Sequence, residues 1–275
     1  MTKLTLPNFL IIGAPRCGTT WMHRNLRQHP EIYMPLRKEL HFFDRDYARG
    51  LAYYSKFFAA HRRESAVGEA TPSYLNKPFL ASRIRQDLPG VRLIASLRNP
   101  VDRLYSRYWN GKLNRPHQAS WAFEDMLRRA PDVFEVESYY DHLVRYYDVF
   151  PAEALLVLIF DDLLSEPAAF IRRIYEFLGV LADFTPRLMS LKVNASASKG
   201  RLARHRSLWH LQRILTGLGA GRMARAIQKW NSVELPPMSE ATRRWLVQEV
   251  FYEKNQKLAA LIGRDLSHWN EVGSA

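Results

Sequence analysis

The chain has 275 residues, 47% of them hydrophobic, so it can bury a substantial core and is most simply one large domain. Its formal charge of +13 favours an anionic partner or substrate and leaves nucleic acid, glycan, membrane surface and nucleotide open. One cysteine excludes an internal disulfide framework and a cysteine-rich metal site. The sequence has no apolar run of the roughly 18–20 residues that a membrane span needs, and Met1–Leu4 passes directly into the first predicted strand. We therefore expect a cytoplasmic protein without a transmembrane segment or signal peptide.

The first predicted strand leads into a candidate anion-binding loop. Phe9–Ile12 has the pattern of a short buried strand that stops at Gly13, Ala14–Gly18 that of a tight loop, and a helix is predicted to begin at Thr19. The first N–H groups of a helix have no partners within it, and the helix dipole favours negative charge there. Arg16 adds a forked cation, and Thr19 and Thr20 add hydroxyl donors. The pattern predicts a phosphate site, with an ordinary strand–turn–helix as the alternative.

The spacing Gly-x-x-x-x-Gly-Thr-Thr differs at one position from the loop that binds nucleoside triphosphates. Thr19 stands where that loop has its lysine, and the nearest cation is Arg16. This difference disfavours ATP or GTP. Cys17 is placed at a helix N-terminus beside Arg16, where the thiolate is favoured, so we expect its alkylation to block nucleotide binding.

Glu39 and His41 form a candidate acid–base pair in a segment where charged residues run into aromatic ones. If the segment is extended, residues two apart point to one face. A carboxylate and an imidazole together are suited to general-base catalysis. The alternative is a surface glutamate and a packed histidine.

The rest of the chain alternates strands with helices. Strands are predicted from Ala66, over Val91–Leu97 and over Ala154–Phe160, and helices over 21–28, 46–63, 79–87, 99–109, 122–129, 139–150, 166–178 and 239–262. We expect the last helix to pack on the outside. This alternation predicts an α/β fold, with a P-loop-like, mostly parallel sheet covered by helices on both faces. No repeat or linker divides residues 1–275, which favours one domain.

A second anion site is predicted after the strand that ends at Leu97. Asn99 is a good N-cap and Pro100 suits the first helical position, so Arg98 falls at the carboxyl end of the strand and Ser106 two turns into the helix. Both can face the crevice where open α/β sheets bind ligands. The alternative is a capped helix with a solvent-exposed arginine.

Asp161 and Asp162 follow a predicted apolar strand. This arrangement resembles the magnesium-holding strand of phosphate-loop enzymes. The two aspartates also fit the cap of the helix over 166–178, and we prefer that interpretation.

The segment 184–233 contains no acidic residue and about ten lysines and arginines. Lys199, Gly200 and Arg201 lie in a loop of small residues, where a close backbone approach and two cations suit a phosphate. Residues 202–234 are predicted to be a basic helical lid or a substrate-side segment. An interfacial surface and a solvated basic face are the alternatives.

The three predicted anion sites together resemble the sulfotransferases that use 3′-phosphoadenosine 5′-phosphosulfate (PAPS). Pro15–Trp21 looks like that family's loop for the 5′-phosphosulfate, Arg98 with Ser106 like its 3′-phosphate site, and Ser198–Arg201 like the loop that closes over the nucleotide.

Two further segments resemble the glycan (heparan-type) branch of that family. Lys38–Asp44 matches a stretch whose glutamate serves as catalytic base, and Gly263–Trp269 has a counterpart there. Two positions depart from the pattern: Arg16 stands where the family often has lysine, and Ala70 where the heparan-type pattern has a substrate-side lysine. The second departure disfavours heparan as substrate. The expected lack of a membrane anchor points the same way, towards a bacterial-type cytoplasmic enzyme.

The resemblance implies a sulfotransferase fold and in-line sulfuryl transfer from PAPS to a hydroxyl, less readily an amine, of a small molecule or glycan. The product would be 3′,5′-adenosine bisphosphate (PAP), with no metal ion and no nucleic acid required, and a homo-oligomer stays open. The implied donor-binding residues are Arg16, Cys17, Gly18, Thr19, Thr20, Trp21 (against the adenine), Arg98, Ser106, Lys199, Gly200 and Arg201, and the implied catalytic residues are Glu39 as base, His41 as second choice, and Arg16. The alternatives are a nucleotide-dependent kinase and a non-catalytic basic protein that binds polyanions or nucleic acid.

Overall fold

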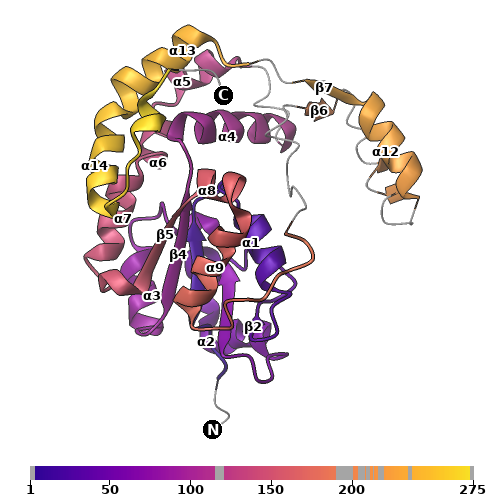
Figure 1. Cartoon of the computed structure of the whole chain (residues 1–275), viewed down its shortest axis with the longest axis vertical. Helices are drawn as coiled ribbons and strands as arrows, with labels where there is room; N and C mark the ends of the chain where they lie inside the picture. Colours follow the sequence, from indigo (N-terminus) through magenta and orange to yellow (C-terminus); the bar gives the residue numbers. More distant parts are fainter. Residues whose placement is uncertain are drawn as a thin grey trace.

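The computed structural model describes residues 4–114, 121–189, 201–203, 208, 211–212, 214–215, 220–234 and 237–272. Its centre is a five-stranded sheet in the order β2-β3-β1-β4-β5, in which every neighbouring pair of strands is parallel (Figure 1). The strands are β1 (Phe9–Gly13), β2 (Ile32–Tyr33), β3 (Ala66–Ala70), β4 (Arg92–Leu97) and β5 (Leu155–Ile159). An antiparallel pair, β6 (Arg201–Ala203) and β7 (Ser232–Glu234), lies to the side of this sheet.

Helices precede and follow the strands of the sheet, as the alternating pattern predicts. They are α1 (Thr19–Leu26), α2 (Gly50–Ser55), α3 (Leu80–Asp87), α4 (Pro100–Asn114), α5 (Phe123–Arg129), α6 (Val133–Val136), α7 (Tyr139–Tyr147), α8 (Phe160–Ser165), α9 (Pro167–Leu178), α12 (Gly221–Trp230), α13 (Glu240–Trp245) and α14 (Tyr252–Ile262). None of the helices in the part of the chain that the structure describes is long and apolar enough to cross a membrane.

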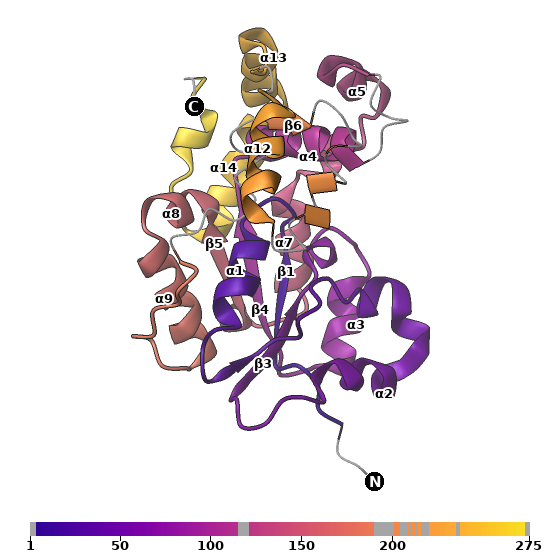
Figure 2. The same cartoon turned by 90° about the vertical axis from the view of Figure 1, so that its right-hand side faces the viewer.

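The core lies on both faces of the sheet, because successive side chains of a strand point in opposite directions. Leu10 and Ile12 of β1 pack in one apolar cluster with α2, α3, α7 and α14, whereas Phe9 and Ile11 pack in another with α1 and α9. Figures 1 and 2 show these two groups of helices on opposite sides of the sheet. A strand covered on both faces needs apolar residues throughout, which explains the unbroken run in β1. The predicted α/β architecture is confirmed.

The C-terminal helical region differs from the predicted single helix over 239–262. Ser239 caps α13 by accepting a hydrogen bond from the Thr242 amide, a π-helical turn over Leu246–Phe251 follows, and α14 completes the region. The region packs on the outside of the molecule, as expected, and buries one face (Figure 1). Leu246, Val247 and Phe251 are fully buried in a third apolar cluster with residues of α4 and α5.

The predicted cap at Asp161 and Asp162 is also wrong, because a separate short helix intervenes. Both aspartates lie in the first turn of α8, and Glu166 is the N-cap residue of α9. Asp162 forms an ion pair with Arg173 of α9 (3.3 Å), and Asp161 accepts a hydrogen bond from the Trp269 indole N–H (2.9 Å). These contacts tie α8 to α9 and to the C-terminal segment.

The topology brings three chain segments together at the carboxyl edge of the sheet. Strands β3, β1 and β4 are neighbours, so the residues that follow them lie side by side. Backbone hydrogen bonds join these segments: the Ala14 amide donates to the Ser96 carbonyl (2.8 Å), and the Thr71 amide donates to the Ile11 carbonyl (3.1 Å). Arg16 and Arg98, two of the predicted site residues, belong to the segments that follow β1 and β4 at this edge.

Candidate active site

The donor loop, Ala14–Gly18, connects β1 to α1. Gly18 is the N-cap residue of α1, with φ of 80° in the left-handed region, and a Cβ added there would lie 2.6 Å from the Leu163 Cδ2 atom. Glycine is therefore required by both conformation and space. No side chain caps the N-terminus of α1, and the first turn of this helix holds no acidic residue. Thr19 is buried and Thr20 half-buried at the start of the helix.

Arg16 links the donor loop to the second predicted anion site. Its Nε donates to the Ser106 Oγ atom on α4 (3.1 Å), and its Nη1 lies 3.4 Å from the Asn110 Oδ1 atom one turn further on. Arg16 and Ser106 are 90 residues apart in the sequence. The structure thus joins residues that the sequence assigns to two separate loops.

Arg98 follows β4 and adds a second cation beside Arg16. Its guanidinium lies over the Phe160 ring, 5.1 Å from the ring centroid. Burial and, to a smaller extent, repulsion from Arg98 lower the pKa of Arg16. The arginine nevertheless remains charged at physiological pH. Among the described residues, neither arginine forms an ion pair with a carboxylate. Two neighbouring guanidinium groups without a carboxylate partner form a site suited to an anion.

Trp21 packs into the molecule between α1 and α9. Its ring makes an edge-to-face contact with Phe170, at 6.1 Å between centroids, and its indole N–H donates to the Met189 carbonyl (3.3 Å). Only 6% of the side chain is exposed, so at most an edge of the ring is accessible to a nucleobase. The expected contact of Trp21 with an adenine stays a prediction.

The expectation of a reactive thiolate at Cys17 is wrong. The side chain is fully buried, with Sγ 3.6 Å from the Pro15 carbonyl oxygen and 3.8 Å from the Tyr139 hydroxyl. Burial raises the pKa of Cys17 to about 11, and the opposing effects of Arg103 and Arg98 do not offset it. The thiol is therefore protonated and inaccessible at neutral pH. Burial, which the sequence does not reveal, raises the pKa of this thiol more than the nearby helix N-terminus and cations lower it.

Glu39 and His41 do meet, although the segment is not extended. Both residues have left-handed backbone conformations, with φ of 62° and 58°. The Glu39 Oε2 atom lies 3.8 Å from the His41 Nε2 atom, and Oε1 lies 2.5 Å from the Lys38 Nζ atom. The Glu39 side chain is 46% exposed, and its backbone amide donates to the Ala70 carbonyl (2.9 Å) at the end of β3. This half-exposed carboxylate is open to an incoming substrate.

Asp44 orients His41 from the other side of the ring. Both Asp44 carboxylate oxygens lie 3.1 Å from the His41 Nδ1 atom. Ser73 donates to the same carboxylate (3.1 Å), and the Lys77 Nζ atom lies 3.3 Å away. Burial would raise the pKa of Asp44, but the contacts with His41 and Lys77 outweigh burial and lower it. An ionised Asp44 accepts a hydrogen bond from the Nδ1–H group of His41, which leaves Nε2 facing Glu39.

Asp44 was missing from the predicted site, although the sequence contains a usable signal. The residues follow the spacing Glu-x-His-x-x-Asp, and the aspartate lies in the π-helical turn Phe42–Asp46 that begins directly after His41. The turn brings the i+3 carboxylate back to the imidazole. In an extended segment, as the sequence analysis assumed, residues three apart point to opposite faces, so Asp44 would not contact His41.

Glu69 is a second carboxyl group missing from the predicted site, and it supports the Glu39 segment from inside. It is 1% exposed and accepts hydrogen bonds from the hydroxyls of Thr71 (2.5 Å), Tyr54 (2.9 Å) and Tyr74 (3.0 Å). Burial raises its pKa despite these three hydrogen bonds. Thr71 Oγ1 in turn lies 3.4 Å from the His41 backbone amide.

The third predicted anion site falls mostly outside the described residues. Lys199 and Gly200 belong to the part of the chain that the structure does not describe, and Arg201 is described only through its backbone in β6, opposite Glu234 of β7. The role of this segment stays a prediction.

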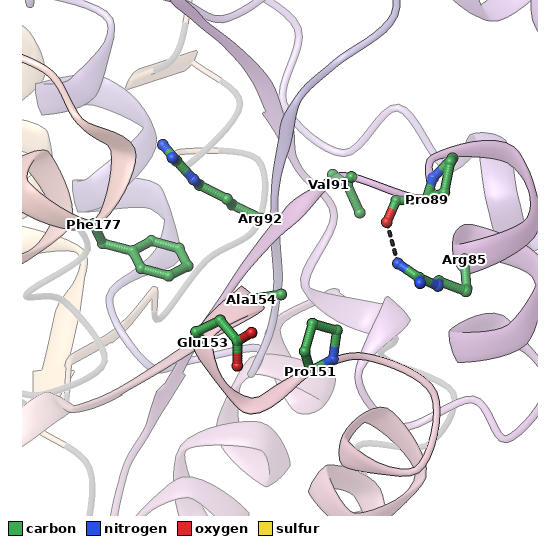
Figure 3. Close-up of a pocket in the computed structure, with 9 residues that line it drawn as sticks. Arg85, Pro89, Val91, Arg92, Pro151, Glu153, Ala154 and Phe177 are labelled. Carbon is green, nitrogen blue, oxygen red and sulfur yellow. Dashed lines mark hydrogen bonds between the residues drawn. The ribbon is translucent and has the colours of Figure 1, made fainter.

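A hollow of about 420 Å³ lies at the opposite end of the sheet from these residues (Figure 3). It is formed by the chain segments around the amino ends of β4 and β5, where Arg92, Ala154 and Phe177 contribute to the lining. In Figure 3, Arg85 donates to the Pro89 carbonyl, so one of the cations that line the hollow already has a partner. None of the predicted site residues lines this hollow.

Comparisons with known proteins relate this chain to one family. A profile of the sulfotransferase domain matches residues 6–206. The mouse heparan sulfate glucosamine 3-O-sulfotransferase 3B1 is 31% identical over 189 residues, which make up 66% of this chain and 48% of that protein. The membrane-associated sulfotransferase kil1 of Dictyostelium discoideum is 36% identical over 140 residues, 48% of this chain and 30% of that protein. This chain thus spans no more than about half the length of these curated relatives.

A solved structure provides a similarity over nearly the whole chain. The crystal structure of a sulfotransferase from Alicyclobacillus acidocaldarius superposes with a TM-score of 0.69 at 28% sequence identity, and the match covers 97% of this chain and 100% of the other. Because the domain profile covers well over half of its residues, this chain belongs to the sulfotransferase family.

Proposed function

We propose that this protein transfers a sulfuryl group from PAPS to a hydroxyl of a small molecule or carbohydrate. The observation that carries the proposal is that Arg16, which donates to Ser106, lies near enough to Arg98 to be repelled by it, while neither arginine has a carboxylate partner among the described residues. Arg98 and Asn99 connect β4 to α4, and we call this connection the Arg98 loop. PAPS carries anionic groups on both the 5′ and the 3′ side of its ribose, and a site where the donor loop meets the Arg98 loop suits such a molecule.

We assign the donor's phosphates to the two ends of this junction. The N-terminus of α1, with Thr19 and Thr20, would hold the 5′-phosphosulfate. Arg98 and Ser106 would hold the 3′-phosphate. The Ser106 oxygen already accepts from Arg16, so its own O–H group remains able to donate to a phosphate.

The proposed chemistry requires positioning and charge stabilisation more than covalent participation. In-line transfer builds negative charge on the bridging and equatorial oxygens, and fixed cations and N–H donors stabilise that charge. We assign this stabilisation of charge to Arg16 and to the N–H groups in the first turn of α1. Arg16 supplies charge and a hydrogen-bonding fork, but it does not release a proton to the leaving phosphate.

We assign Glu39 as the base that removes the acceptor's proton, with His41 as the second candidate. Glu39 is half-exposed and is held at the end of β3, next to the strand that carries the donor loop. His41, oriented by Asp44, presents Nε2 to the Glu39 carboxylate at 3.8 Å. General-base catalysis of this kind contributes about 10²–10⁴-fold to the rate.

The acceptor class and the cellular location are finer parts of the proposal. The names of the heparan sulfate relatives favour a carbohydrate hydroxyl, whereas Ala70, at the end of β3 beside Glu39, supplies no charge for a sulfated glycan. The whole-chain similarity to the Alicyclobacillus protein supports a bacterial-type enzyme, and we propose a cytoplasmic location for it. Cell fractionation tests the location, and sedimentation tests for a homo-oligomer.

Calorimetric titration of the purified protein with PAP, AMP and ATP in the absence of magnesium tests the proposal. We expect selective binding of PAP with micromolar affinity, roughly −8 kcal/mol. Transfer of ³⁵S from labelled PAPS to a panel of hydroxyl and amine acceptors would then identify the substrate. A preference for ATP that requires magnesium would indicate a kinase. Salt-sensitive binding of polyanions without nucleotide preference would indicate a basic binding module.

A further inference from the structure

A buried polar cluster lies beneath the donor loop and takes no part in the chemistry proposed above. It consists of Arg103 on α4, Glu137 between α6 and α7, and Tyr139 at the start of α7, and we call it the loop-support cluster. Each of these side chains is at most 2% exposed. Polar groups this deeply buried are costly unless every one is hydrogen-bonded, so their partners show what the cluster holds in place.

Arg103 connects α4 to the donor loop. Its Nε donates to the Pro15 carbonyl (3.0 Å), and its Nη1 donates to the Val136 carbonyl (3.2 Å) and to the Glu137 carboxylate. Glu137 also accepts from Arg107. Burial opposes the charge on Arg103, but the Glu137 carboxylate together with Tyr139 and Cys17 outweighs burial and raises the pKa of Arg103. The charged fork is therefore stable in the interior and fixes the position of the Pro15 carbonyl.

Tyr139 connects α7 to the Arg98 loop. Its hydroxyl donates to the Arg98 carbonyl (2.9 Å) and lies 3.4 Å from the Arg98 amide, so it contacts both polar backbone atoms of that residue. The same hydroxyl lies 3.8 Å from Cys17 Sγ in the donor loop. The Arg103 guanidinium lies 5.2 Å from the centre of the Tyr139 ring, which joins the two supports.

The two supports act on the two loops that carry the proposed phosphate contacts. Arg103 holds the residue before Arg16, and Tyr139 holds the backbone of Arg98. Buried ion pairs are weak evidence for stability, because apolar residues of similar size often serve the fold equally well. The cluster's hydrogen bonds end on the backbone of the two loops, which indicates a role in their relative position.

We propose that Arg103 and Tyr139 are positioning residues for donor recognition. They hold the donor loop and the Arg98 loop in one arrangement, so that the 5′ and 3′ phosphates are bound together. This inference rests on the proposed function, since it concerns the same nucleotide. It assigns two residues that contact no substrate a specific effect on nucleotide affinity.

Tyr139→Phe tests this inference, with Tyr146→Phe as the matched control. Tyr146 lies on the same helix and is 1% exposed, and its hydroxyl also donates to a backbone carbonyl, that of Tyr74 (3.0 Å), away from both loops. Both variants lose one buried hydroxyl, so similar decreases in Tm are expected. We expect Tyr139→Phe alone to weaken PAP binding, by about 3- to 10-fold, in line with one net hydrogen bond. AMP binding should change less, because Tyr139 contacts mainly the loop proposed for the 3′-phosphate.

Arg103→Lys provides a second test on the side of the donor loop. Lysine keeps the charge opposite Glu137 but lacks the fork that reaches Pro15 and Glu137 together. We expect weaker binding of both AMP and PAP and a higher KM for PAPS, with an unchanged KM for the acceptor. If Tyr139→Phe and Tyr146→Phe bind PAP equally well, the inference is overturned while the proposed function stands. If the unmodified protein binds neither nucleotide, both are overturned.

Discussion

The two sides of the candidate site differ in how their charges are paired. The donor side has Arg16 and Arg98 side by side, and no carboxylate pairs with either among the residues described. The acceptor side has three carboxyl groups, Glu39, Asp44 and Glu69, in segments that follow or contact β3. The two sides meet at adjacent strand ends. This division suits transfer from an anionic donor to a neutral acceptor that must lose a proton.

Glu39→Gln removes the proposed base and has the largest expected effect. The amide keeps the size of the side chain but cannot accept a proton, so kcat should fall about 10²–10⁴-fold. The Kd for PAP should stay within about twofold of the original value, because the donor side is untouched. Glu153→Gln, at an exposed position near the opposite edge of the sheet, is the control. A fall in kcat of less than tenfold would exclude Glu39 as the base.

Arg98→Ala removes a cation from the donor side. A charge-assisted hydrogen bond contributes about 1.5–3 kcal/mol, so the Kd for PAP should rise about 10- to 150-fold. AMP, which lacks the 3′-phosphate, should bind almost as before. Arg92→Ala changes an exposed arginine at the other end of β4 and serves as the control. Equal losses for AMP and PAP would show that Arg98 acts only through the overall charge.

Asp44→Asn tests the orientation of His41 on the acceptor side. The amide no longer favours the Nδ1 proton of His41, so the ring can adopt the other tautomer or turn away from Glu39. We expect a fall in kcat of about tenfold, on the low side of an acid–base contribution, and an unchanged Kd for PAP. An unchanged kcat with normal folding would separate Asp44 and His41 from the reaction.

Sequence patterns predict the framework of this site well. The apolar runs of β1 and β4 are buried on both faces and that of β5 is largely buried, so they can be recognised without knowledge of their neighbours. The glycine turn before Thr19 and the Asn99-Pro100 helix start are local signals in the same way. These elements fix which residues stand at the carboxyl edge of the sheet.

The contacts within the site depend on tertiary structure and escape the sequence. Nothing in the pattern indicates that Arg16 donates to Ser106, or that Arg103 and Tyr139 contact the loop backbone. Burial decides the state of the Cys17 thiol, and its extent is a property of the whole fold. The left-handed residues around Leu40 were missed for a related reason, since hydrogen bonds to β3 and Thr71 stabilise conformations that the local sequence disfavours.

Two carboxyl groups on the acceptor side should respond to pH in opposite directions, although the effect on stability is the smallest expected here. Asp44 contacts His41 and Lys77, which lower its pKa against burial, whereas Glu69 contacts three hydroxyls, which do not prevent burial from raising its pKa. The contribution of Asp44 is therefore present above its unfolded-state pKa of about 3.9 and is lost as the pH falls through its lower folded-state pKa. The contribution of Glu69 is present below its unfolded-state pKa of about 4.3 and is lost as the pH rises through its higher folded-state pKa.

Urea unfolding between pH 3 and pH 8 measures both contributions. Relative to the unmodified protein, Asp44→Asn should lose less stability at the acidic end, and Glu69→Gln should lose less as the pH rises above about 4 to 5. The two substitutions are matched, because each replaces a buried carboxylate by an amide of the same shape. Parallel pH profiles for both variants would contradict the opposite directions of the two pKa shifts. Distinct profiles would show that the sign of a partner's charge, more than the number of its hydrogen bonds, decides which acceptor-side carboxyl is ionised.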